Sequence, residues 1–480
     1  MSTLTKIALL IGVCLSLALA SRTTAAEPIK ALLITGQQNH NWRYTSMVHK
    51  DTLEATGLFT VDLTDSPSSK LSDAKGLAGY QVFVIDYNGD RWGEPAETNF
   101  LNAVKNGAGV VIIHATNNSF VGWTEWEKMI ALLWINGTTG HGKFHPFDVN
   151  YVDREHPITK GLSDMKAHPD ELYHTLVNTQ NAKFHLLASA MSSKESGGTG
   201  KVEPMALVLE YGKGRVFHTP LGHVWTNSFD SKVSVVDPQF RVLLCRGTEW
   251  AGTGKVTLGA AWDDVRKHNT LTATEKAQGW KLLFDGTTTR GWRGYKSDKM
   301  PEGVWDTTHG SLWRKPGKEG GDIVTVDQYA DFEFECEWNI ATGGNSGIIY
   351  RCTEDHGASY ETGAEMQVLD DVKYPDSSPK NRAGALYDLF ALSQDVARPA
   401  GVWNHARVVC KGTRIEHWLN GYKVVDIDTT SEEYKKAFAA SKWTQMPDMG
   451  TRMKGHIALQ DHGSEVMYRN VKIRELTSGK

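Results

Sequence analysis

The sequence predicts two domains, an α/β domain built on a doubly wound parallel sheet and then an all-β sandwich. Two patterns indicate this division. Apolar strand-like runs alternate with helical patterns over residues 28–250, and short runs of alternating polar and apolar residues follow from about residue 280. The length of 480 residues also exceeds what one compact core normally holds.

The composition excludes several classes of protein. Hydrophobic residues make up 40% of the chain and charged residues 22%, which is ordinary for a globular protein and rules out a disordered or fibrous chain. The formal net charge is -4, from 52 basic and 56 acidic residues. This balance leaves no basic surface for nucleic acid or anionic lipid. The 16 tryptophans are compatible with aromatic sugar-binding surfaces as well as with cores.

Residues 1–26 have the pattern of a signal peptide. Lys6 precedes a largely apolar run from Ile7 to Ala20, and Thr24-Ala25-Ala26 then forms a small-residue cleavage site. The run is too short to span a bilayer. Cys14 follows Val13 and not the Gly or Ala of a lipoprotein signal. We therefore expect an exported protein, periplasmic or secreted, whose mature chain begins at residue 27 and has no membrane span.

The α/β domain is expected over residues 27–255. A helical pattern runs from Glu94 to Asn106, and Gly107 follows it. Near-continuous apolar strands separated by such helices predict a parallel sheet that is covered on both faces. The predicted strands are 31–35, 82–86, 110–114 and 205–209.

A linker over residues 256–278 and a sandwich over 279–478 complete the predicted organisation. The linker contains a short helix, with Thr272 as its N-cap three residues before Glu275. Alternation with a period of two and the Asn420-Gly421 turn favour an antiparallel sandwich. Its predicted strands are 332–338, 347–352, 365–369, 407–410, 414–420, 455–462 and 466–473.

Cysteine is sparse in the mature chain. Four cysteines remain after residue 26, and the three ways of pairing them are indistinguishable from the sequence. No CxxC pair is present, so a thiolate zinc site is not expected.

Polar side chains recur at alternate positions of the predicted sandwich strands. Glu365 and Gln367 share one face of their strand, opposite Met366 and Val368. The same alternation turns His456, Gln460 and His462 away from the core, and it groups Trp418 with Glu416. Such a face is either simply solvated or, with Glu, Gln, His, Arg and Trp together, suited to binding a sugar.

Several motifs in residues 275–478 resemble the 3-keto-disaccharide hydrolase family, in the family's order. They include Gly279-Trp-Lys-Leu-Leu-Phe-Asp-Gly286, Gly344-Asn-Ser-Gly-Ile-Ile-Tyr-Arg351, Glu365-Met-Gln-Val-Leu-Asp-Asp371, Gly384-Ala-Leu-Tyr-Asp388, His417-Trp-Leu-Asn-Gly421 and Leu459-Gln-Asp-His-Gly463. The resemblance implies a concanavalin-like jelly roll and cleavage of glycosides that are oxidised at C3.

A ketone at C3 acidifies the C2 proton and places the leaving group on C1, so elimination followed by hydration can cleave the bond without two paired carboxylates. Glu365 is the candidate base, and His462 is the candidate acid or a metal ligand. Arg351 or a divalent ion would stabilise the enolate, and Asp370 is a further catalytic candidate, as a ligand or a turn cap. The candidates for substrate binding are Gln367, Gln460, Trp418, Asn345, Asp371 and Tyr387.

A group of histidines is expected at the carboxyl edge of the α/β sheet, where ligands collect in doubly wound folds. His114 ends a predicted strand, and acid–base chemistry or a metal such as zinc would suit it together with other side chains. The candidates for this second site or metal centre are His114, His223, His141, Glu171 and His40. A divalent metal ion is the one candidate cofactor, and the alternative is that these histidines are ordinary surface or core residues.

This region is also similar to the trehalose-utilisation (ThuA-like) family. The similarity is carried by Asn106-Gly-Ala-Gly-Val-Val-Ile-Ile-His-Ala115, His156-Pro-Ile-Thr-Lys-Gly161, Asp170-Glu-Leu-Tyr173 and Leu221-Gly-His223. It implies a flavodoxin-like fold related to class I glutamine amidotransferases. Those enzymes need a cysteine at the strand–helix elbow, where this chain has His114, so amidotransferase chemistry is not expected. Leu132–Gly137 departs from the family's double-glycine pattern.

The preferred interpretation is an exported enzyme that cleaves 3-keto glycosides in its β domain and has a sugar-processing ThuA-like domain. Its partner would be a small carbohydrate. In one alternative the sandwich is a lectin-like binding module beside a catalytic ThuA-like domain, and in another the chain is a scaffold without chemistry. Calorimetry with unmodified sugars separates these alternatives.

Overall fold

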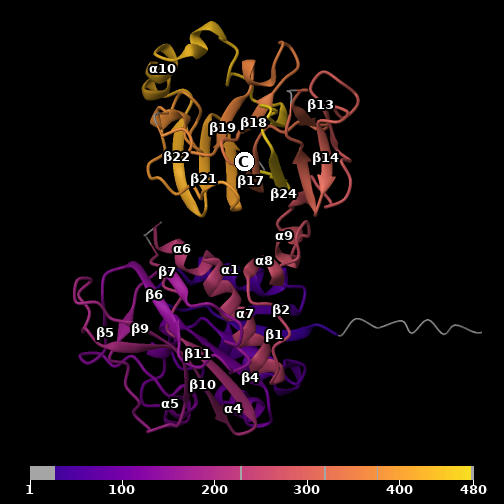
Figure 1. Ribbon diagram of the computed structural model, residues 1–480. Helices are drawn as coiled ribbons and strands as arrows, with labels where there is room; N and C mark the ends of the chain where they lie inside the picture. The colour runs from indigo at the N-terminus through magenta and orange to yellow at the C-terminus, as the bar shows by residue number, and fades with distance from the viewer. Residues whose placement is uncertain (1–26, 227–229, 318–319, 376, 477–480) are drawn as a thin grey trace, which may run out of the picture.

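The computed structural model describes residues 27–226, 230–317, 320–375 and 377–476, and its chain folds into an α/β region and a β-rich region (Figure 1). The predicted signal peptide lies outside these residues. Within them, no helix is both long and apolar enough to cross a bilayer.

A nine-stranded mixed sheet forms the centre of the α/β region, in the order β2-β1-β3-β4-β11-β10-β9-β6-β7. The parallel half comprises β2 (Phe59–Thr64), β1 (Ile29–Ile34), β3 (Val82–Ile85), β4 (Gly109–Ile113) and β11 (Gly214–Thr219). The antiparallel half comprises β10 (Val202–Tyr211), β9 (His185–Met191), β6 (His145–Tyr151) and β7 (Met165–Asp170). Two short strands, β5 (Gly140–His141) and β8 (Tyr173–His174), pair separately.

The expectation of a wholly parallel sheet is wrong at residues 205–209. They lie in β10, which runs antiparallel to β11. The two strands are joined by a hairpin in which Tyr211 pairs with Gly214, and Gly212 has a φ of 62°. A two-residue turn that needs positive φ joins antiparallel neighbours, whereas a parallel pair needs a long crossover.

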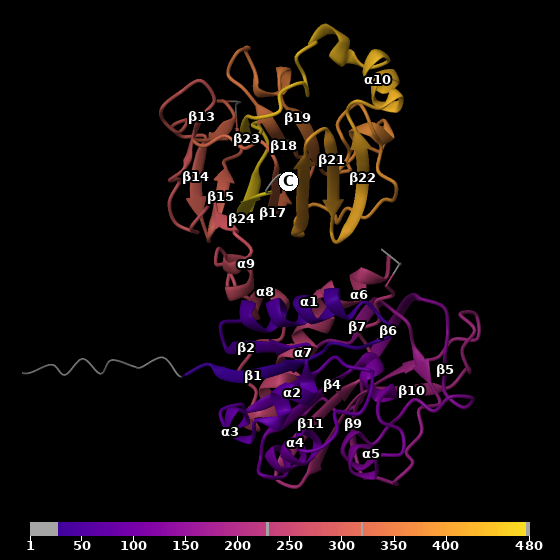
Figure 2. The same ribbon diagram turned by 180° about the vertical axis from the view of Figure 1, so that it is seen from behind.

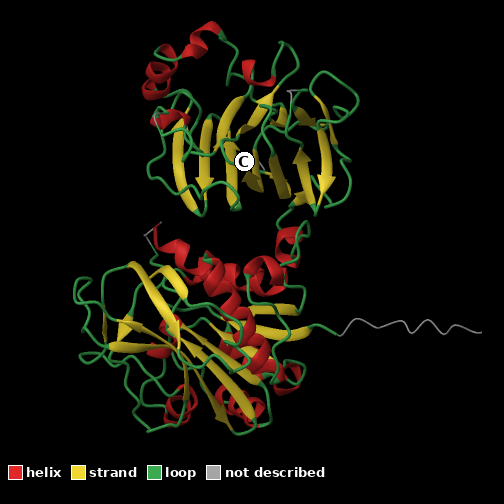
Figure 3. Ribbon diagram, in the orientation of Figure 1, coloured by secondary structure: helices red, strands yellow, loops and turns green. Residues whose placement is uncertain are grey.

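Helices cover both faces of this sheet, as predicted (Figure 3). Apolar side chains of α1 (Trp42–Ala55) and α7 (Pro238–Thr253) belong to the core on one face. Those of α2 (Pro67–Ser72), α3 (Ala74–Leu77), α4 (Ala96–Lys105) and α5 (Thr124–Ile130) belong to the core on the other. The turn η1 (His114–Asn118) directly follows β4, and α6 (Val233–Val236) precedes α7.

Two short helices, α8 (Trp262–Val265) and α9 (Ala273–Ala277), lie in the connection to the sandwich (Figure 2). The predicted cap of α9 is present, because the Thr272 hydroxyl accepts from the Glu275 N–H and the Glu275 carboxylate accepts from the Thr272 N–H. Ion pairs between side chains attach this connection to the sandwich. Arg266 pairs with Glu337, and Glu275 pairs with Lys472.

The β-rich region is a sandwich of two antiparallel sheets. The eight-stranded sheet follows the order β14-β15-β24-β17-β20-β21-β22, with β12 beside β24, and the five-stranded sheet follows β13-β16-β23-β18-β19. The strands of the first are β12 (Lys281–Leu282), β14 (Trp305–Thr308), β15 (Ser311–Arg314), β17 (Phe332–Ile340), β20 (Asn404–Lys411), β21 (Arg414–Leu419), β22 (Tyr422–Asp428) and β24 (Val466–Glu475). Those of the second are β13 (Trp292–Gly294), β16 (Ile323–Thr325), β18 (Asn345–Cys352), β19 (Ala364–Leu369) and β23 (His456–Leu459).

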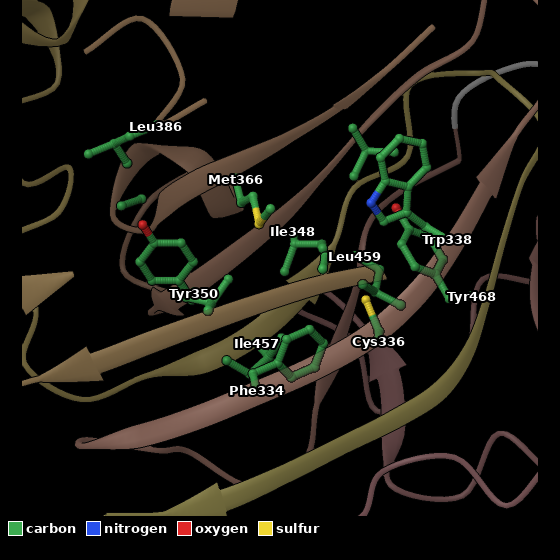
Figure 4. Close-up of a cluster of buried hydrophobic side chains, with 14 of the residues drawn as sticks. Phe334, Cys336, Trp338, Ile348, Tyr350, Met366, Leu386, Ile457, Leu459 and Tyr468 are labelled. Atoms are coloured by element: carbon green, nitrogen blue, oxygen red, sulfur yellow. The ribbon is translucent and has the colours of Figure 1, made fainter. Parts of the chain in front are cut away.

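The sandwich core lies between the two sheets. Phe334, Cys336 and Trp338 of β17 meet Ile348, Met366 and Leu459 of the five-stranded sheet (Figure 4). Because these side chains occupy alternate positions, the residues between them face outward. The helix α10 (Glu432–Ala439) packs at the end of the sandwich through Tyr434.

All four cysteines of the described residues are free and buried. Three of them, Cys336, Cys352 and Cys410, lie in the sandwich, and Cys245 lies in α7. The described fold therefore depends on its hydrophobic cores and not on disulfide bonds.

Candidate functional site

The outer face of the five-stranded sheet carries Glu365 and Gln367. Both extend from β19 opposite Met366 and Val368, which are buried in the sandwich core. Gln367 pairs with Gly347 of β18, and Glu365 pairs with Ile349. The alternation along β19 predicts this arrangement, and the structure agrees with it.

Glu365 is a buried carboxyl group with an unusual environment. It is 5% exposed, and burial raises its pKa to about 8, with Lys442 opposing the rise and the nearby charge of Asp322 adding to it. Gly347 leaves the space that the carboxyl group needs, because a Cβ atom there would stand 2.2 Å from Glu365 Oε1. A carboxyl group with a pKa near neutrality can both accept and return a proton.

Aromatic and cationic side chains flank Glu365. The N–H of Tyr387 donates to the carbonyl oxygen of Glu365 at 3.0 Å. The Lys442 Nζ atom lies 4.4 Å from the centre of the Tyr387 ring and 4.7 Å from that of Trp443. Sequence reasoning missed Lys442, Trp443 and Asp322, because their loops reach β19 only in the folded chain and show no periodic pattern.

The other candidates near this face are placed at its edges. The N–H of Gln460 donates to the Gly347 carbonyl, and His462 lies exposed just after β23. At the end of β19, Asp370 accepts from the Gly343 N–H at 2.7 Å and Asp371 accepts from the Ala383 N–H at 3.0 Å. One carboxylate oxygen of each, and the Asn345 side-chain oxygen, are buried without a hydrogen-bond partner among the described residues. Burial raises the pKa of Asp371.

Two candidates do not meet Glu365. Arg351 lies at an irregularity of β18 with a φ of 55°, and its guanidinium donates to the carbonyl oxygens of Ala330 and Gly412, both at 2.8 Å. Trp418 lies on the outer face of the eight-stranded sheet, with Arg407 4.6 Å above its ring. The expectation of one common polar face is therefore wrong for Trp418, since alternation identifies a face within a strand but not the sheet to which the strand belongs.

A second cluster lies at the carboxyl ends of parallel strands in the α/β region. His40 follows β1, His114 follows β4 and His223 follows β11, and all three are buried. One nitrogen of each lies within 4.8 Å of the other two. Burial lowers the pKa of all three, that of His40 to about 3, so these imidazoles are neutral at pH 7.

Hydrogen bonds fix the tautomers of two of these rings. His114 Nδ1 donates to the Pro220 carbonyl at 2.8 Å, so its Nε2 atom accepts, and the Tyr173 hydroxyl lies 3.1 Å from that atom. His223 Nδ1 lies 3.1 Å from a Glu171 carboxylate oxygen and also 3.1 Å from His114 Nε2, so Nδ1 carries the proton and Nε2 is the acceptor. His223 Nε2 and His40 Nδ1 are buried and have no hydrogen-bond partner in the part of the chain that the structure describes.

Two carboxylates support this cluster. Glu171 also pairs with His141 at 3.1 Å, and this contact raises the pKa of His141. Asp170 accepts from the backbone N–H groups of Gly222 and His223, so it holds the loop that carries His223. The structure thus brings together all five residues that the sequence proposes for this second site.

No reactive thiol lies at the strand–turn elbow. His114 occupies it with a φ of 46°, and Cys245 is buried in α7, where burial raises the pKa of its thiol. A buried protonated thiol is a poor nucleophile.

Both regions of the chain match known protein families. Residues 279–474 match the family described as 3-keto-alpha-glucoside-1,2-lyase-like domain, and residues 30–251 match the family described as trehalose utilisation. A 3-keto-disaccharide hydrolase of Bacteroides thetaiotaomicron is 31% identical over 48% of this chain and 93% of its own length. The chain belongs to the 3-keto-disaccharide hydrolase family. A ThuA-like domain precedes the domain that gives the family its name.

Solved structures resemble each half of this family member separately. A provisionally named glycosyl hydrolase of Parabacteroides distasonis is 35% identical, with a TM-score of 0.42, and the match covers 44% of this chain and 100% of that one. A provisionally named ThuA-like protein of Parabacteroides merdae is 36% identical, with a TM-score of 0.45, and the match covers 50% of this chain and 100% of that one.

Proposed function

We propose that the sandwich cleaves glycosides whose sugar carries a ketone at C3, with Glu365 as the base. The observation that carries this proposal is the carboxyl group of Glu365, which is buried on the outer face of the five-stranded sheet and has a raised pKa. Its neighbours Gln367, Tyr387 and Trp443 suit a sugar, with an amide for hydroxyl groups and aromatic rings for C–H faces.

In the proposed reaction Glu365 takes the proton from C2, which the ketone at C3 acidifies. The electron pair of the C2–H bond forms the C1–C2 double bond as the C1–O bond breaks, and the leaving oxygen takes up a proton. Water then adds across the double bond: its oxygen bonds to C1, C2 takes back the proton held by Glu365, and the proton of the water replaces the one given to the leaving oxygen, so the net change is hydrolysis. Glu365 with a pKa of about 8 is partly ionised at neutral pH and can return the proton to C2.

His462 remains our candidate for the acid that protonates the leaving oxygen, and Gln460, Asn345, Asp370 and Asp371 for groups that hold the sugar. For Arg351 the hydrogen bonds to Ala330 and Gly412 favour a structural role. A divalent ion at this face would supply stabilisation of the enolate oxygen, and the unpartnered oxygens of Asn345 and Asp370 are suitable ligands.

The test is turnover of a 3-keto glucoside and of its unoxidised parent by residues 27–480. The wild type should cleave only the keto form, and Glu365→Gln should lose that activity without unfolding. The control Glu433→Gln changes an exposed carboxylate of α10 and should leave the rate unchanged. Wild-type rates in Glu365→Gln would refute the role of Glu365. Tight binding of unmodified sugars without any cleavage would support a lectin-like module instead.

We further propose export to the periplasm or the medium, on the pattern of residues 1–26, and assign the two regions to flavodoxin-like and concanavalin-like jelly-roll architectures. N-terminal sequencing of the protein from its native host tests the first of these. A mature terminus near residue 27 is expected, and an intact Met1 would contradict it.

A further inference from the structure

We propose that His40, His114 and His223 form a divalent metal centre in the ThuA-like domain, separate from the Glu365 face of the sandwich. A tetrahedral zinc ion with nitrogen ligands at about 2.0–2.1 Å has its ligand atoms about 3.4 Å apart. The three histidine nitrogens lie within 4.8 Å of one another, so small side-chain rotations suffice to enclose an ion.

The surroundings of the rings are those of metal ligands. Each ligating histidine usually donates its other N–H to a carbonyl or a carboxylate, which fixes the tautomer. His114 does so to Pro220, and the Nδ1–H of His223 lies 3.1 Å from both a Glu171 carboxylate oxygen and His114 Nε2. His223 Nε2 and His40 Nδ1 are buried without a hydrogen-bond partner among the described residues, and such atoms are costly unless something binds them.

The backbone also brings the three histidine rings together. Each ring comes from a different loop at the carboxyl end of a parallel strand, and His114 is held at a φ of 46°, a conformation that a β-carbon disfavours. A histidine that served only to fill the core would need neither this backbone nor two other histidines against it. His40 stacks on Trp225 at 4.7 Å and meets His114 and His223 edge-on, each at 4.8 Å.

Three imidazole nitrogens favour zinc and its transition-metal neighbours over magnesium or calcium, which prefer oxygen. Three protein ligands also leave a coordination position open, as in catalytic zinc sites. Tyr173 contacts His114 and Glu171 contacts His223, and the Trp225 side chain, which stacks on His40, is 39% exposed. A proton donor, a carboxylate and an exposed indole suit a small oxygen-rich ligand that chelates through a hydroxyketone.

This choice of ligand class rests on the proposed function, because cleavage in the sandwich releases a hydroxyketone sugar. The metal centre itself does not rest on it. Metal content and cleavage by the sandwich are measured independently, so the failure of either proposal is distinguishable from the failure of the other.

The experiment uses the full mature chain, stripped by a chelator and dialysed against zinc, cobalt(II), manganese(II) or magnesium. Elemental analysis should find one equivalent of zinc or cobalt, and bound cobalt should show visible absorption bands. His40→Ala and His223→Ala should each lose most of this metal, and Glu171→Gln should weaken binding by roughly 10- to 100-fold. The control His185→Gln alters an exposed histidine of the same domain and should retain full loading.

Circular dichroism and thermal melting accompany each variant. If His223→Ala fails to fold, His223→Gln and Glu171→Gln take its place. Absence of stoichiometric zinc or cobalt in the folded wild type would overturn the proposal, as would full loading of both His40→Ala and His223→Ala. With the metal bound, a hydroxyketone sugar should perturb the cobalt spectrum and its 3-deoxy analogue should not. The same response to both sugars would overturn the assigned ligand class but not the metal centre.

Discussion

The Oε1 atom of Glu365 lies directly over Gly347 of the neighbouring strand, with only 2.2 Å between that oxygen and the place a Cβ atom would take at residue 347. Gly347 also pairs with Gln367, so the glycine sits beneath both polar residues of β19. The absence of a side chain in β18 is thus what allows a carboxyl group to lie flat on a sheet face and be buried there.

Gly347→Ala should displace the Glu365 carboxyl group and lower kcat/KM for a 3-keto glycoside by about 100-fold, since misplacement by about 1 Å costs that much. Residue 347 lies in a regular strand, so the fold should persist. Steady-state kinetics and a thermal melt measure the two effects. Gly79→Ala is the matched control, because the nearest atom to its Cβ position is 4.0 Å away. Equal rates for the two variants would show that the placement of Glu365 does not matter.

The sequence predicts some residues of the two sites but not others. A period of two along β19 suffices to pair Glu365 with Gln367, and the rule that ligands gather at the carboxyl ends of parallel strands suffices to group His114 with His223. The position of Trp418 could not be predicted in this way, because only long-range strand pairing decides which sheet a strand joins. The same holds for Lys442, since a loop residue 77 positions from Glu365 leaves no local signal.

Glu365 should also make stability depend on pH. Its pKa is raised from 4.5 to about 8 in the folded chain, so between those values the folded state keeps a proton that the unfolded state has lost. Its contribution is therefore fully present below pH 4.5 and is lost as the pH rises through about 8. Urea denaturation across this window should show a fall in the free energy of unfolding that is smaller in Glu365→Gln. An identical fall in both proteins would mean that Glu365 is not the group responsible.

Lys442 should set the pH at which Glu365 ionises. Its charge lowers the pKa of Glu365, in opposition to the effect of burial. For a base of this kind, kcat/KM should rise with pH and level off above about 8. Lys442→Gln should move this rise to higher pH by a fraction of a unit, because the side chain is exposed and its charge is screened. Lys436→Gln in α10 serves as the control, and a profile unchanged by Lys442→Gln would contradict the coupling.

Glu337 should stabilise the junction between the linker and the sandwich. It is 8% exposed, and it pairs with Arg266 of the linker and with Arg469 at 2.8 Å. Burial alone would raise its pKa, but the two guanidinium groups hold it well below its usual range. Glu337→Gln removes the anion shared by Arg266, which is partly buried, and Arg469, which keeps Asp263 as a second partner, and this should cost about 2 kcal/mol in the free energy of unfolding.

This difference in the free energy of unfolding should be largest near neutral pH. It should shrink as the pH falls below the usual pKa of a glutamate, because the wild type then begins to lose the stabilisation that the Glu337 carboxylate provides. Denaturation at pH 7 and at pH 4 measures it. Glu432→Gln removes an exposed carboxylate that pairs with Lys435 and should cost under about 0.5 kcal/mol. Equal losses of unfolding free energy in Glu337→Gln and Glu432→Gln would show that the ion pairs of Glu337 do not stabilise the junction.

The four cysteines of residues 27–480 should be present as unreactive thiols. All are buried and free, and burial raises the pKa of each, that of Cys410 to about 12, so the thiolate that reacts with alkylating and disulfide reagents is scarce. Thiol titration of residues 27–480 should detect almost none in the native state and all four after denaturation. A reducing agent should leave the melting temperature unchanged, because no disulfide restricts the unfolded chain. Fewer than four thiols after denaturation under non-reducing conditions would reveal a disulfide, and fast native labelling would show that one of these sites opens to solvent.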